Sequence, residues 1–311
     1  MTGDGHARTA VVVVSYGAPE LLLRNAAMTS SASSGSTLFV VVDSWSSDAV
    51  RERTREIVAD HGWELVAPGA NVGFGVGCNL GVDRARELGA ETVVLVNPDL
   101  ALTPRDLEVL VRRVHAEPDA LVAPRVVRPD GSPYAAGIID LRLVDGTMRA
   151  SGRRPTGEPV EAYQEWLSGA CLACTVDLWD RVGGFDPRYF LYWEDVDLSR
   201  RVLEAGGRLV VADDAVAVHD EGGTQSRTSP RAKSATYYRY SLRNRLLYAS
   251  IWLDDAGRDR WRRTALRAAR SVVLQGGRRQ LLTSTVAWRA AWGGTRDGLR
   301  LLRSATSGPK R

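Results

Sequence analysis

Three short, uninterrupted apolar runs constrain the fold of this chain more than any other feature. They occupy residues 10–14 (AVVVV), 38–42 (LFVVV) and 92–96 (TVVLV). Strands that are apolar on both faces are typical of a parallel sheet that is covered on both sides. A helical pattern at residues 49–61 separates two of the runs. The sequence therefore predicts an α/β protein with a mostly parallel, Rossmann-like sheet flanked by helices.

Acidic residues follow two of these runs at the predicted ends of strands. Ligands of open α/β sheets bind outside the carboxyl ends of the strands, so Asp43 is expected to accept hydrogen bonds from a base or ribose. The alternative for Asp43 is a cap of the next helix, a role that fits Asp48 better. Asp99 follows Pro98 in a turn, and its carboxylate is a suitable ligand for Mg²⁺ or Mn²⁺. The alternative for Asp99 is a plain turn signal.

A run of glycines at Gly73, Gly75 and Gly77 suggests a dinucleotide-binding fingerprint at first sight. Its spacing is GxGxG rather than GxGxxG, and it does not follow the first strand, so we reject that interpretation. Glycines at the start of a helix still allow a phosphate or a sugar to approach the backbone closely.

The stretch Trp193-Glu194-Asp195-Val196-Asp197 places three carboxylates within four residues, directly after several aromatic residues. Apolar surroundings and crowded like charges raise the pKa of a carboxylate toward the range of a general base. The alternative is an acidic first turn of a helix, which favours the helix dipole. Farther along, His219 ends an apolar run before a glycine turn and can face a binding site, although a lone histidine is usually structural.

Charge divides the chain into two parts. The net charge is +4, yet residues 231–311 hold 19 basic and 4 acidic residues, or +15, which leaves 22 against 33, or −11, for residues 1–230. We therefore expect a catalytic domain at residues 1–228 and a basic, amphipathic helical appendage at residues 229–311, with helices near 257–275, 279–292 and 295–304. The appendage has two possible roles, to which we give equal weight. It packs against the acidic domain, or it binds an anionic membrane surface. Nucleic acid is not an expected partner, since no recognised binding motif is present. Residues 128–165 are predicted to be loops that contact an acceptor.

Cysteine content and apolar runs indicate the compartment. Three cysteines, Cys78, Cys171 and Cys174, form no disulfide framework and favour a reducing compartment. The N-terminus lacks the pattern of a signal peptide, and no apolar run approaches the ~18 residues of a membrane span. The expected location is the cytoplasm, with peripheral attachment to the inner face of the membrane if the appendage binds lipid.

Four pieces in this order resemble the family 2 glycosyltransferases of GT-A fold, especially their rhamnosyltransferase-like bacterial branch. The resemblance covers roughly residues 10–224. The pieces are residues 42–48 (VDSWSSD), residues 71–74 and 79–81 (NVGF and NLG), residues 97–99 (NPD), and residues 167–171 (LSGAC) with 183–186 (GGFD) and 193–197 (WEDVD).

The resemblance implies a role for each matching residue. Asp195 is the general base that deprotonates the acceptor hydroxyl, with Glu194 beside it in the catalytic motif. Asp99 and His219 bind the metal, Mg²⁺ or Mn²⁺. The residues implied to contact the nucleotide sugar are Ser15, Tyr16, Asp43, Gly73, Asn79 and Asn97. The chain departs from the family at Ser44, where Asn is usual, and at Asn97, where the first acid of a DxD motif would stand.

The activity implied is inverting, metal-dependent transfer of a sugar from a dTDP-, UDP- or GDP-sugar to a hydroxyl on a glycan, a lipid-linked intermediate or a small molecule. Rhamnose, and a place in cell-wall or polysaccharide biosynthesis, come from the resemblance alone. Two alternatives remain: a nucleotide-sugar-binding pseudoenzyme that scaffolds a membrane-associated glycan assembly, and a nucleotidyltransferase that makes the activated sugar. The second would need a Gly-rich, basic loop after the first strand, which residues 15–19 (SYGAP) do not supply.

Overall fold

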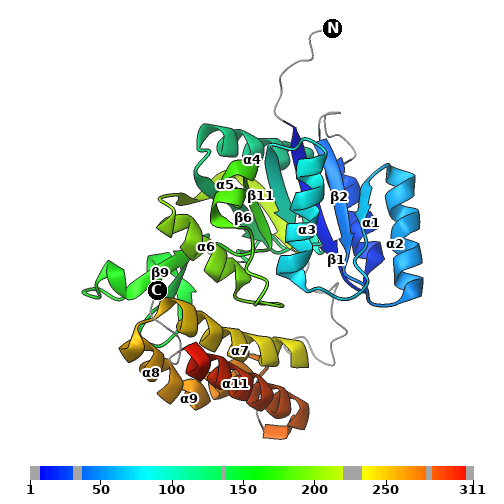
Figure 1. Ribbon diagram of the computed structural model, residues 1–311. Coiled ribbons are helices and arrows are strands. Elements are labelled where there is room, and N and C mark those ends of the chain that lie inside the picture. Colours follow the sequence, from blue (N-terminus) through cyan, green and yellow to red (C-terminus); the bar gives the residue numbers. More distant parts are fainter. Residues whose placement is uncertain (1–7, 31–36, 135–136, 220–232, 278–281, 306–311) are drawn as a thin grey trace.

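A large mixed sheet forms the centre of the computed structural model, which describes residues 8–30, 37–134, 137–219, 233–277 and 282–305 (Figure 1). Its strand order is β3-β2-β1-β4-β10-β6-β11-β5. Strands β1 to β4 are parallel, and β10 runs antiparallel between β4 and β6. The strands are β1 (Thr9–Ser15), β2 (Thr37–Asp43), β3 (Glu64–Val66), β4 (Thr92–Val96), β5 (Leu100–Leu102), β6 (Ala120–Val127), β10 (Cys171–Thr175) and β11 (Arg208–His219).

Helices cover both faces of this sheet, which explains the apolar runs. Alternate residues of β1 point to opposite sides, so that Val11 and Val13 belong to one buried cluster and Val12 and Val14 to another. The first cluster contains side chains of α1 (Pro19–Ser30), α2 (Asp48–His61) and α4 (Pro104–Ala116). The second contains side chains of α3 (Phe74–Glu87), α5 (Val176–Val182) and α6 (Glu194–Glu204). The predicted α/β class, with the GT-A type of mostly parallel sheet, is confirmed.

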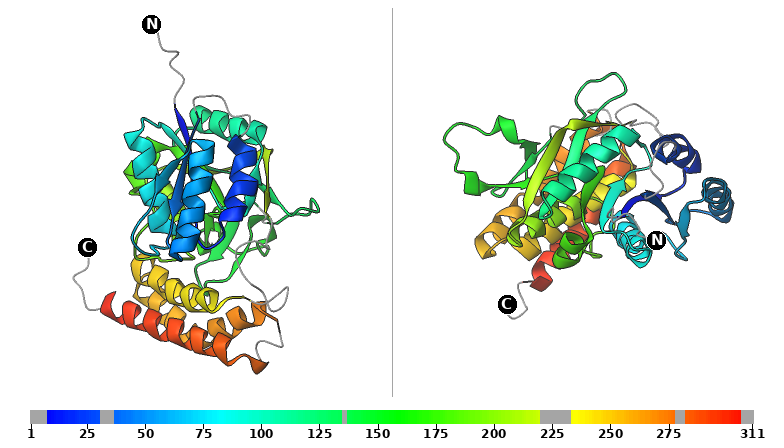
Figure 2. Two further views of the ribbon diagram at one scale, coloured as in Figure 1. Left: turned by 90° about the vertical axis from the view of Figure 1, so that its right-hand side faces the viewer. Right: turned by 90° about the horizontal axis from the view of Figure 1, so that it is seen from above.

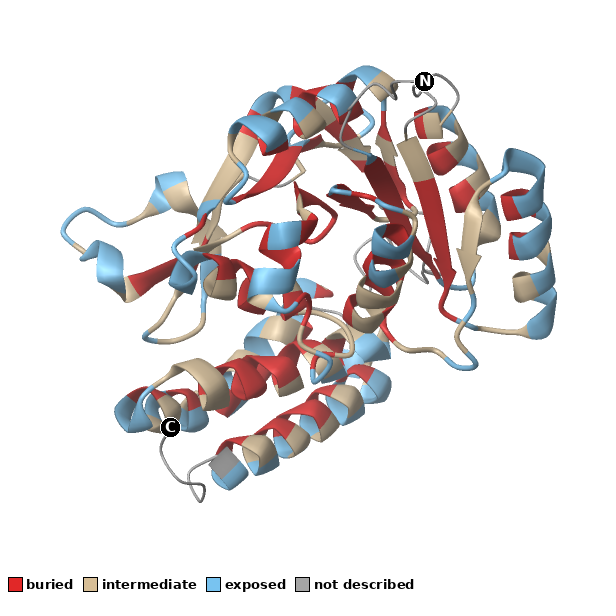
Figure 3. Cartoon of the chain, turned by 45° about the horizontal axis from the view of Figure 1, so that its top comes forward, coloured by how far each residue is buried: buried red, intermediate tan, exposed pale blue. Residues whose placement is uncertain are grey.

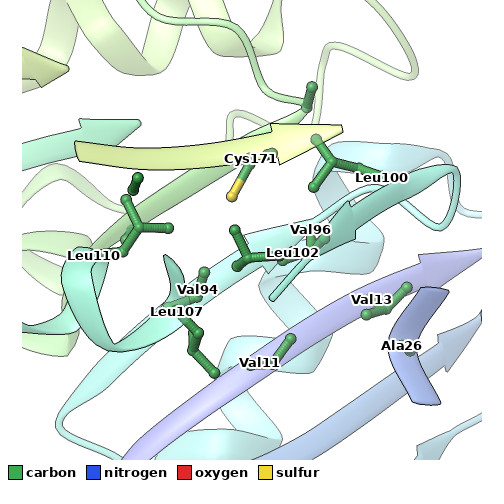
Figure 4. Close-up of a cluster of buried hydrophobic side chains, with 14 of the residues drawn as sticks. Val11, Val13, Ala26, Val94, Val96, Leu100, Leu102, Leu107, Leu110 and Cys171 are labelled. Atoms are coloured by element: carbon green, nitrogen blue, oxygen red, sulfur yellow. The ribbon is translucent and has the colours of Figure 1, made fainter. Parts of the chain in front are cut away.

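The short strand β5 is the edge strand of the large sheet, yet its side chains pack in the central apolar cluster. Only three residues, 97–99, join β4 to β5, so the two strand ends lie within about 14 Å of each other. A register shift between Ala212 and Val216 bends β11, the strand with which β5 pairs. Leu100 and Leu102 consequently pack in one cluster with Val94 and Val96 (Figure 4). This bend brings the end of β11 back toward the end of β4.

A second sheet occupies the region predicted to be loops. Its order is β8-β7-β9, formed by β7 (Ile139–Arg142), β8 (Met148–Ala150) and β9 (Tyr163–Trp166), with short 3-10 helices at Ser151–Arg153 and Val160–Ala162. The buried carboxylate of Asp140 on β7 binds Arg154, whose Nε lies 2.6 Å from Oδ2. The loop prediction for residues 128–165 was thus wrong in part. Strands of three or four residues with polar side chains give no apolar run to detect.

Within the described residues, four labelled helices follow the sheet domain and lie together beneath it (Figures 1 and 2). They are α7 (Ala235–Trp252), α8 (Asp255–Arg263), α9 (Ala265–Gln275) and α11 (Thr285–Ala305). The predicted basic helical appendage is therefore present, whereas its expected boundary at 228/229 lies outside the described residues. The helix bounds differ from the expectation: the chain breaks at Thr264 between α8 and α9, and α11 continues through Gly293 and Gly294.

The appendage shares a buried cluster with the sheet domain instead of standing apart. Trp193 and Val196 of the acidic stretch pack in this cluster with Tyr248 of α7 and Trp261 of α8. Figure 3 shows buried residues on the inner sides of these helices and exposed residues on their outer sides. In the part of the chain that the structure describes, no helix is both long enough and apolar enough to cross a membrane.

Candidate active site

Most of the candidate site residues gather at one edge of the large sheet, where β1, β2 and β4 end. Ser15 and Asp43 are register partners at the ends of β1 and β2. The backbone N–H of Asn97, just after β4, donates to the carbonyl of Ala170, just before β10, at 2.9 Å. His219, the last residue of β11, pairs with Leu100 and thus lies next to Asp99. Strand pairing alone therefore brings together residues that are up to 200 positions apart in the chain.

The predicted nucleotide residues Ser15 and Asp43 carry buried polar atoms. Both side chains are almost inaccessible, at 1% exposure each. Among the described residues, Ser15 Oγ and Asp43 Oδ1 have no hydrogen-bond partner, although Asp43 Oδ2 accepts from Arg51 Nε at 2.6 Å. Buried polar atoms are nearly always paired, so an unpaired hydroxyl and carboxylate oxygen on register partners indicate a ligand that supplies the missing partners. Tyr16, the next residue of the chain, is half exposed at the same edge.

Arg51 and Ser47 explain why Asp43 is available to a ligand. Ser47, rather than Asp43 or Asp48, caps α2, since its side chain accepts from the backbone N–H of Val50. Arg51, in the second turn of α2, fixes one oxygen of Asp43 and leaves the other facing away from the ion pair. The expected alternative, in which Asp43 caps the helix, is not what the structure shows.

The loop before α3 is fastened to the end of β2. Ser44 Oγ donates to Asn71 Oδ1 at 3.0 Å and accepts from the N–H of Val72 at 3.2 Å. Gly73 has a φ of 79°, and an added Cβ would lie 2.1 Å from the carbonyl oxygen of Phe190, so only glycine fits. Ser44, which stands where the family usually has Asn, thus still joins the two loops.

The amide of Asn79 is engaged within the protein. Its Nδ2 donates to the carbonyl of Phe185 at 2.8 Å, and its Oδ1 accepts from the N–H of Phe185 at 2.9 Å. The glycines of α3 likewise face protein: an added Cβ at Gly77 or Gly81 would lie 2.8 Å from Val14 or 2.3 Å from Val12. These glycines allow α3 to pack closely on β1. For Gly73 and Asn79, the contacts observed are structural, and direct binding of a nucleotide remains a prediction.

Asp99 and His219 form the pair expected to bind a metal. His219 Nε2 lies 3.5 Å from Asp99 Oδ1, and both side chains are about nine-tenths buried. Neighbouring ligands of an octahedral Mg²⁺ or Mn²⁺ ion are about 3 Å apart, so both atoms can reach one cation with a small adjustment. Tyr134 stacks on the imidazole, with ring centroids 4.3 Å apart, and fixes its plane.

The number of protein ligands also suits these cations. Within the described ranges, no group of three or more His, Cys, Asp or Glu side chains could hold a metal. Mg²⁺ is usually bound by one or two carboxylates together with the phosphates of a substrate. Asp99 and His219 therefore fit a cation that is bound together with a diphosphate.

Asp195, in the first turn of α6, is partly buried and held in place by backbone donors. Its Oδ2 accepts from the N–H of Gly169, and its Oδ1 from that of Val196, each at 2.9 Å. Burial raises the pKa of Asp195 from 3.8 to about 6, although the two N–H donors act in the opposite direction. Gly169 precedes Ala170, the residue bonded to Asn97, so Asp195 lies near the turn that carries Asp99. A carboxylate with a pKa near 6 is suited to act as a general base at neutral pH.

Glu194 differs from Asp195 in its surroundings. Burial, and next the charge of Asp195, raise the pKa of Glu194 well above its usual value. Its Cβ lies near Gly75 of α3, and its Oε2 is buried without a partner among the described residues. Burial thus disfavours the ionised form of Glu194, whereas Asp195 keeps two backbone N–H donors that favour its ionised form.

The two residues before this motif have unusual backbone conformations. Tyr192 and Trp193 have φ angles of 69° and 76°, in the left-handed region that bulky residues rarely occupy. Such strain persists only where the surrounding structure enforces it. Here Asn244 of α7 donates to the carbonyls of Leu191 and Tyr192, and the ring of Trp193 is buried against Tyr248 and Trp261. The appendage thus holds the chain segment that directs Asp195 toward the sheet edge.

Sequence analysis did not single out four residues that matter for this arrangement: Arg51, Tyr134, Gly169 and Asn244. Gly169 belongs to residues 167–171, which carry the resemblance, but the sequence did not predict that its N–H donates to Asp195. The contacts of the other three residues join different elements of the fold: Arg51 with Asp43, Tyr134 with His219, and Asn244 with Tyr192. No local sequence pattern predicts such contacts.

Three comparisons with known proteins agree with this geometry. The family model described as "Glycosyltransferase like family 2" matches residues 6–249. The N-acetylglucosaminyl-diphospho-decaprenol L-rhamnosyltransferase of Mycobacterium tuberculosis is 29% identical over 220 residues, covering 64% of this chain and 69% of that protein. The Rhamnosyltransferase WbbL of Escherichia coli is 26% identical over 195 residues, covering 58% of this chain and 74% of that protein.

Among solved structures, GalNAc-T7 with UDP, GalNAc and Mn²⁺ has a similar fold, with a TM-score of 0.62 and 15% identity. The match covers 91% of this chain and 55% of that one. At this identity, the similarity concerns the fold alone. The match to the family model includes more than half of the chain and the whole of the site described above. The chain belongs to glycosyltransferase family 2 and is a glycosyltransferase of GT-A fold.

Proposed function

We propose that this enzyme is an inverting, metal-dependent transferase that moves a sugar from a nucleotide-sugar donor to an acceptor hydroxyl. One observation carries the proposal: Asp195 presents a partly buried carboxylate, held by two backbone N–H groups and with a pKa of about 6, near the turn that holds Asp99. That arrangement supplies a proton acceptor close to a site suited to a diphosphate.

The reaction then follows from the roles of the residues. Asp195 accepts the proton of the acceptor hydroxyl as its oxygen attacks the anomeric carbon of the donor. The new glycosidic bond forms as the bond to the diphosphate breaks on the opposite side, and the nucleoside diphosphate departs with that electron pair. Inversion is expected because Glu194 packs near α3 and its burial disfavours ionisation, which makes it unsuited to be a second carboxylate that forms a covalent intermediate.

The donor is expected to lie along the ends of β1, β2 and β4. Ser15 and Asp43 provide the unpaired buried oxygens for the ribose or base, while exposed Tyr16 provides a ring at the same edge. Asp99 and His219 would hold Mg²⁺ or Mn²⁺. When bound, such an ion stabilises the negative charge that develops on the leaving diphosphate.

L-rhamnose on a nucleoside diphosphate is the donor sugar that we favour, and a lipid-linked glycan is the favoured acceptor. Support comes from the two bacterial relatives, which are both named as rhamnosyltransferases, and from the name of the first, which specifies a diphospho-decaprenol acceptor.

The proposal is tested by turnover with purified protein, a panel of dTDP-, UDP- and GDP-sugars, and a polyprenyl-diphosphate-linked acceptor, with and without Mn²⁺. The expected result is transfer from one donor with inverted anomeric configuration, as read from the coupling constants of the product by NMR. Retained configuration would exclude the single-displacement mechanism. Binding of donor without turnover in any combination would favour the scaffold alternative.

A further inference from the structure

The outer side of α11 is apolar and basic, in contrast to its inner side. Small residues at Ala287, Ala291, Gly294 and Gly298 face inward, and an added Cβ at Gly294 would lie 2.0 Å from the carbonyl oxygen of Arg239 on α7. The opposite side displays large side chains. The outer face of α11 is defined here as Val286, Arg289, Trp292 and Arg296, and Leu282 lies just before the helix.

Exposure of these apolar groups is unusually large. Leu282 is 81% exposed, Val286 62% and Trp292 63%. Positions 286, 289, 292 and 296 recur at helical spacing and therefore lie along one side of the helix. The neighbouring helix α9, which packs with α11 in a common cluster, exposes Leu266 and Arg270 as well. Large apolar groups exposed close together generally mark an interaction site.

The positive charge of the C-terminal helices indicates which kind of partner the outer face of α11 binds. Residues 260–296 contain nine arginines and no acidic residue. Among the described residues, the ion pairs of the appendage's arginines lie within the appendage, as in Arg239–Asp297 and Arg262–Asp259, while Arg243 and Arg245 donate to main-chain carbonyls of the sheet domain. A second copy of the chain in a symmetric dimer would place this basic face against itself. A bilayer that contains anionic lipid instead offers both an apolar interior and negative headgroups.

The position of this face relative to the site is also suitable. Tyr237 of α7 packs on Tyr192, and Tyr240 packs on Phe190, with ring centroids 5.1 and 4.9 Å apart. On the other side of α7, Tyr238 shares a cluster with Ala287 and Ala291 of α11. Two packed helices, α7 and α11, with axes roughly 8–10 Å apart, thus separate the loop that leads to Asp195 from the outer face of α11.

We propose that the outer face of α11 binds the surface of an anionic lipid bilayer. Trp292 and Val286 enter the boundary between headgroups and acyl chains, and Arg289 and Arg296 contact lipid phosphates. The enzyme would then receive its acceptor from the membrane in which the acceptor's lipid is anchored. This last step rests on the proposed function, whereas lipid binding itself does not.

Co-sedimentation of the full chain with vesicles tests the proposal in the absence of any sugar donor. Vesicles of phosphatidylcholine with 30–40% phosphatidylglycerol, roughly the charge density of an anionic leaflet, are compared with pure phosphatidylcholine. Binding is expected to the anionic vesicles and to weaken with added salt. Val286→Ser with Trp292→Ser, and separately Arg289→Gln with Arg296→Gln, should each reduce partitioning by about tenfold or more.

Matched controls lie elsewhere on the surface. Val160→Ser removes an apolar side chain that is as exposed as Trp292, at 63%, and Arg55→Gln with Arg112→Gln removes two exposed charges from α2 and α4. These variants should bind vesicles like the unmodified protein. All variants should retain turnover of a short-chain, water-soluble acceptor, which establishes that they are folded.

Three outcomes would overturn the proposal: equal binding to neutral vesicles, unchanged binding of both α11 variants, or a dimer that dissociates when Trp292 is replaced. Loss of turnover with vesicle binding intact would instead contradict only the proposed function.

Discussion

The side-chain amide of Asn244 donates to the main-chain carbonyl of Tyr192 at 2.7 Å and to that of Leu191 at 2.9 Å. Asn244 is fully buried in α7, and Tyr192 begins the strained pair of residues that precedes Glu194 and Asp195. A helix of the appendage thus determines the path of the chain into the catalytic motif. The sheet domain and the appendage consequently form one functional unit, and removal of residues 231–311 would expose the packing surface of α6.

The variant Asn244→Ala should lose activity and stability together. Two buried carbonyls lose their donor, at a cost of about 1–3 kcal/mol in the free energy of unfolding. The strained segment is then expected to relax and displace Asp195, which lowers kcat more than it alters donor affinity. Denaturant unfolding and steady-state kinetics measure both effects. Ser250→Ala, on the same helix, removes only a bond to Leu247 of that helix and serves as the control. Equal kcat in the two variants would contradict this role of Asn244.

Replacement of the proposed base gives a second prediction. Asp195→Asn keeps the size of the side chain and one acceptor for the N–H of Gly169 but cannot accept the proton of the acceptor. We expect kcat to fall by about 10²- to 10⁴-fold while donor affinity stays within a few-fold, as measured by calorimetry. Asp213→Asn, on the exposed part of β11, makes the same chemical change away from the site and should be active. Activity of Asp195→Asn within a few-fold of the unmodified enzyme would exclude Asp195 as the base.

The pH dependence of rate and of stability should be opposite in sign. As the proposed base, Asp195 must be ionised, so kcat/KM is expected to decline as pH falls through about 6. Burial raises the pKa of Asp195 above its value in the unfolded chain, and the folded state therefore binds this proton more tightly. The free energy of unfolding consequently decreases, on account of this group, as pH rises from about 4 to about 6.

Asp195→Asn should therefore be more stable than the unmodified protein at pH 7.5, chosen as roughly 1.5 units above the folded pKa, but not at pH 4. The difference between a pKa of 3.8 and one of about 6 corresponds to at most about 3 kcal/mol. Thermal unfolding of both proteins across this range provides the measurement. A gain of stability that is independent of pH would indicate a cause other than ionisation.

Binding of the metal gives a fourth prediction. Mn²⁺ is expected to increase the affinity for a nucleoside diphosphate, and Asp99→Ala and His219→Ala should each abolish that increase, because each removes one of the two proposed protein ligands. Affinity in the presence of a chelator should change little. Titrations with UDP, GDP and dTDP, with Mn²⁺ and with chelator, provide the comparison, and Asp213→Ala is a matched control. Mn²⁺-enhanced binding that survives in both variants would place the metal elsewhere.

The adjacent glycines of α11 allow an internal comparison. An added Cβ at Gly294 would lie 2.0 Å from the carbonyl oxygen of Arg239, while no atom lies within 4 Å of the corresponding position at Gly293. Gly294→Ala should therefore separate α11 from α7 and lower the melting temperature by several degrees. Gly293→Ala should raise stability by about 0.5–1 kcal/mol, since alanine favours the helix. Similar effects of the two substitutions would contradict the close packing of α11 on α7.

Local patterns predicted much of the sheet domain. The apolar runs of β1, β2 and β4 stand out because a strand that is covered on both faces needs apolar side chains on each side. Asp43, Asp99 and His219 could be named in advance because acids and histidines that follow such runs stand at the edge where ligands bind. Asp195 could be named because three carboxylates are crowded there after several aromatic residues and because the motif resembles that of the family. The short strands β7 to β9 could not be predicted, since three or four partly polar residues show no distinctive hydrophobic period.

The glycine pair of α11 shows the limit of such patterns most clearly. Gly293-Gly294 resembles a break between two helices when only local preference is considered, yet the structure has one helix there, because the backbone of α7 occupies the space beside Gly294.

The sequence by itself determined the α/β class, the basic character of the C-terminal helices and the chemical types of residues at the site. Only the tertiary structure decided that Gly169 donates to Asp195, that Arg51 orients Asp43 and that Asn244 supports Tyr192. These contacts join residues 8 to 52 positions apart. They depend on strand pairing, on the bend in β11 and on the packing of α7, which arise from the whole chain rather than from any short segment of it.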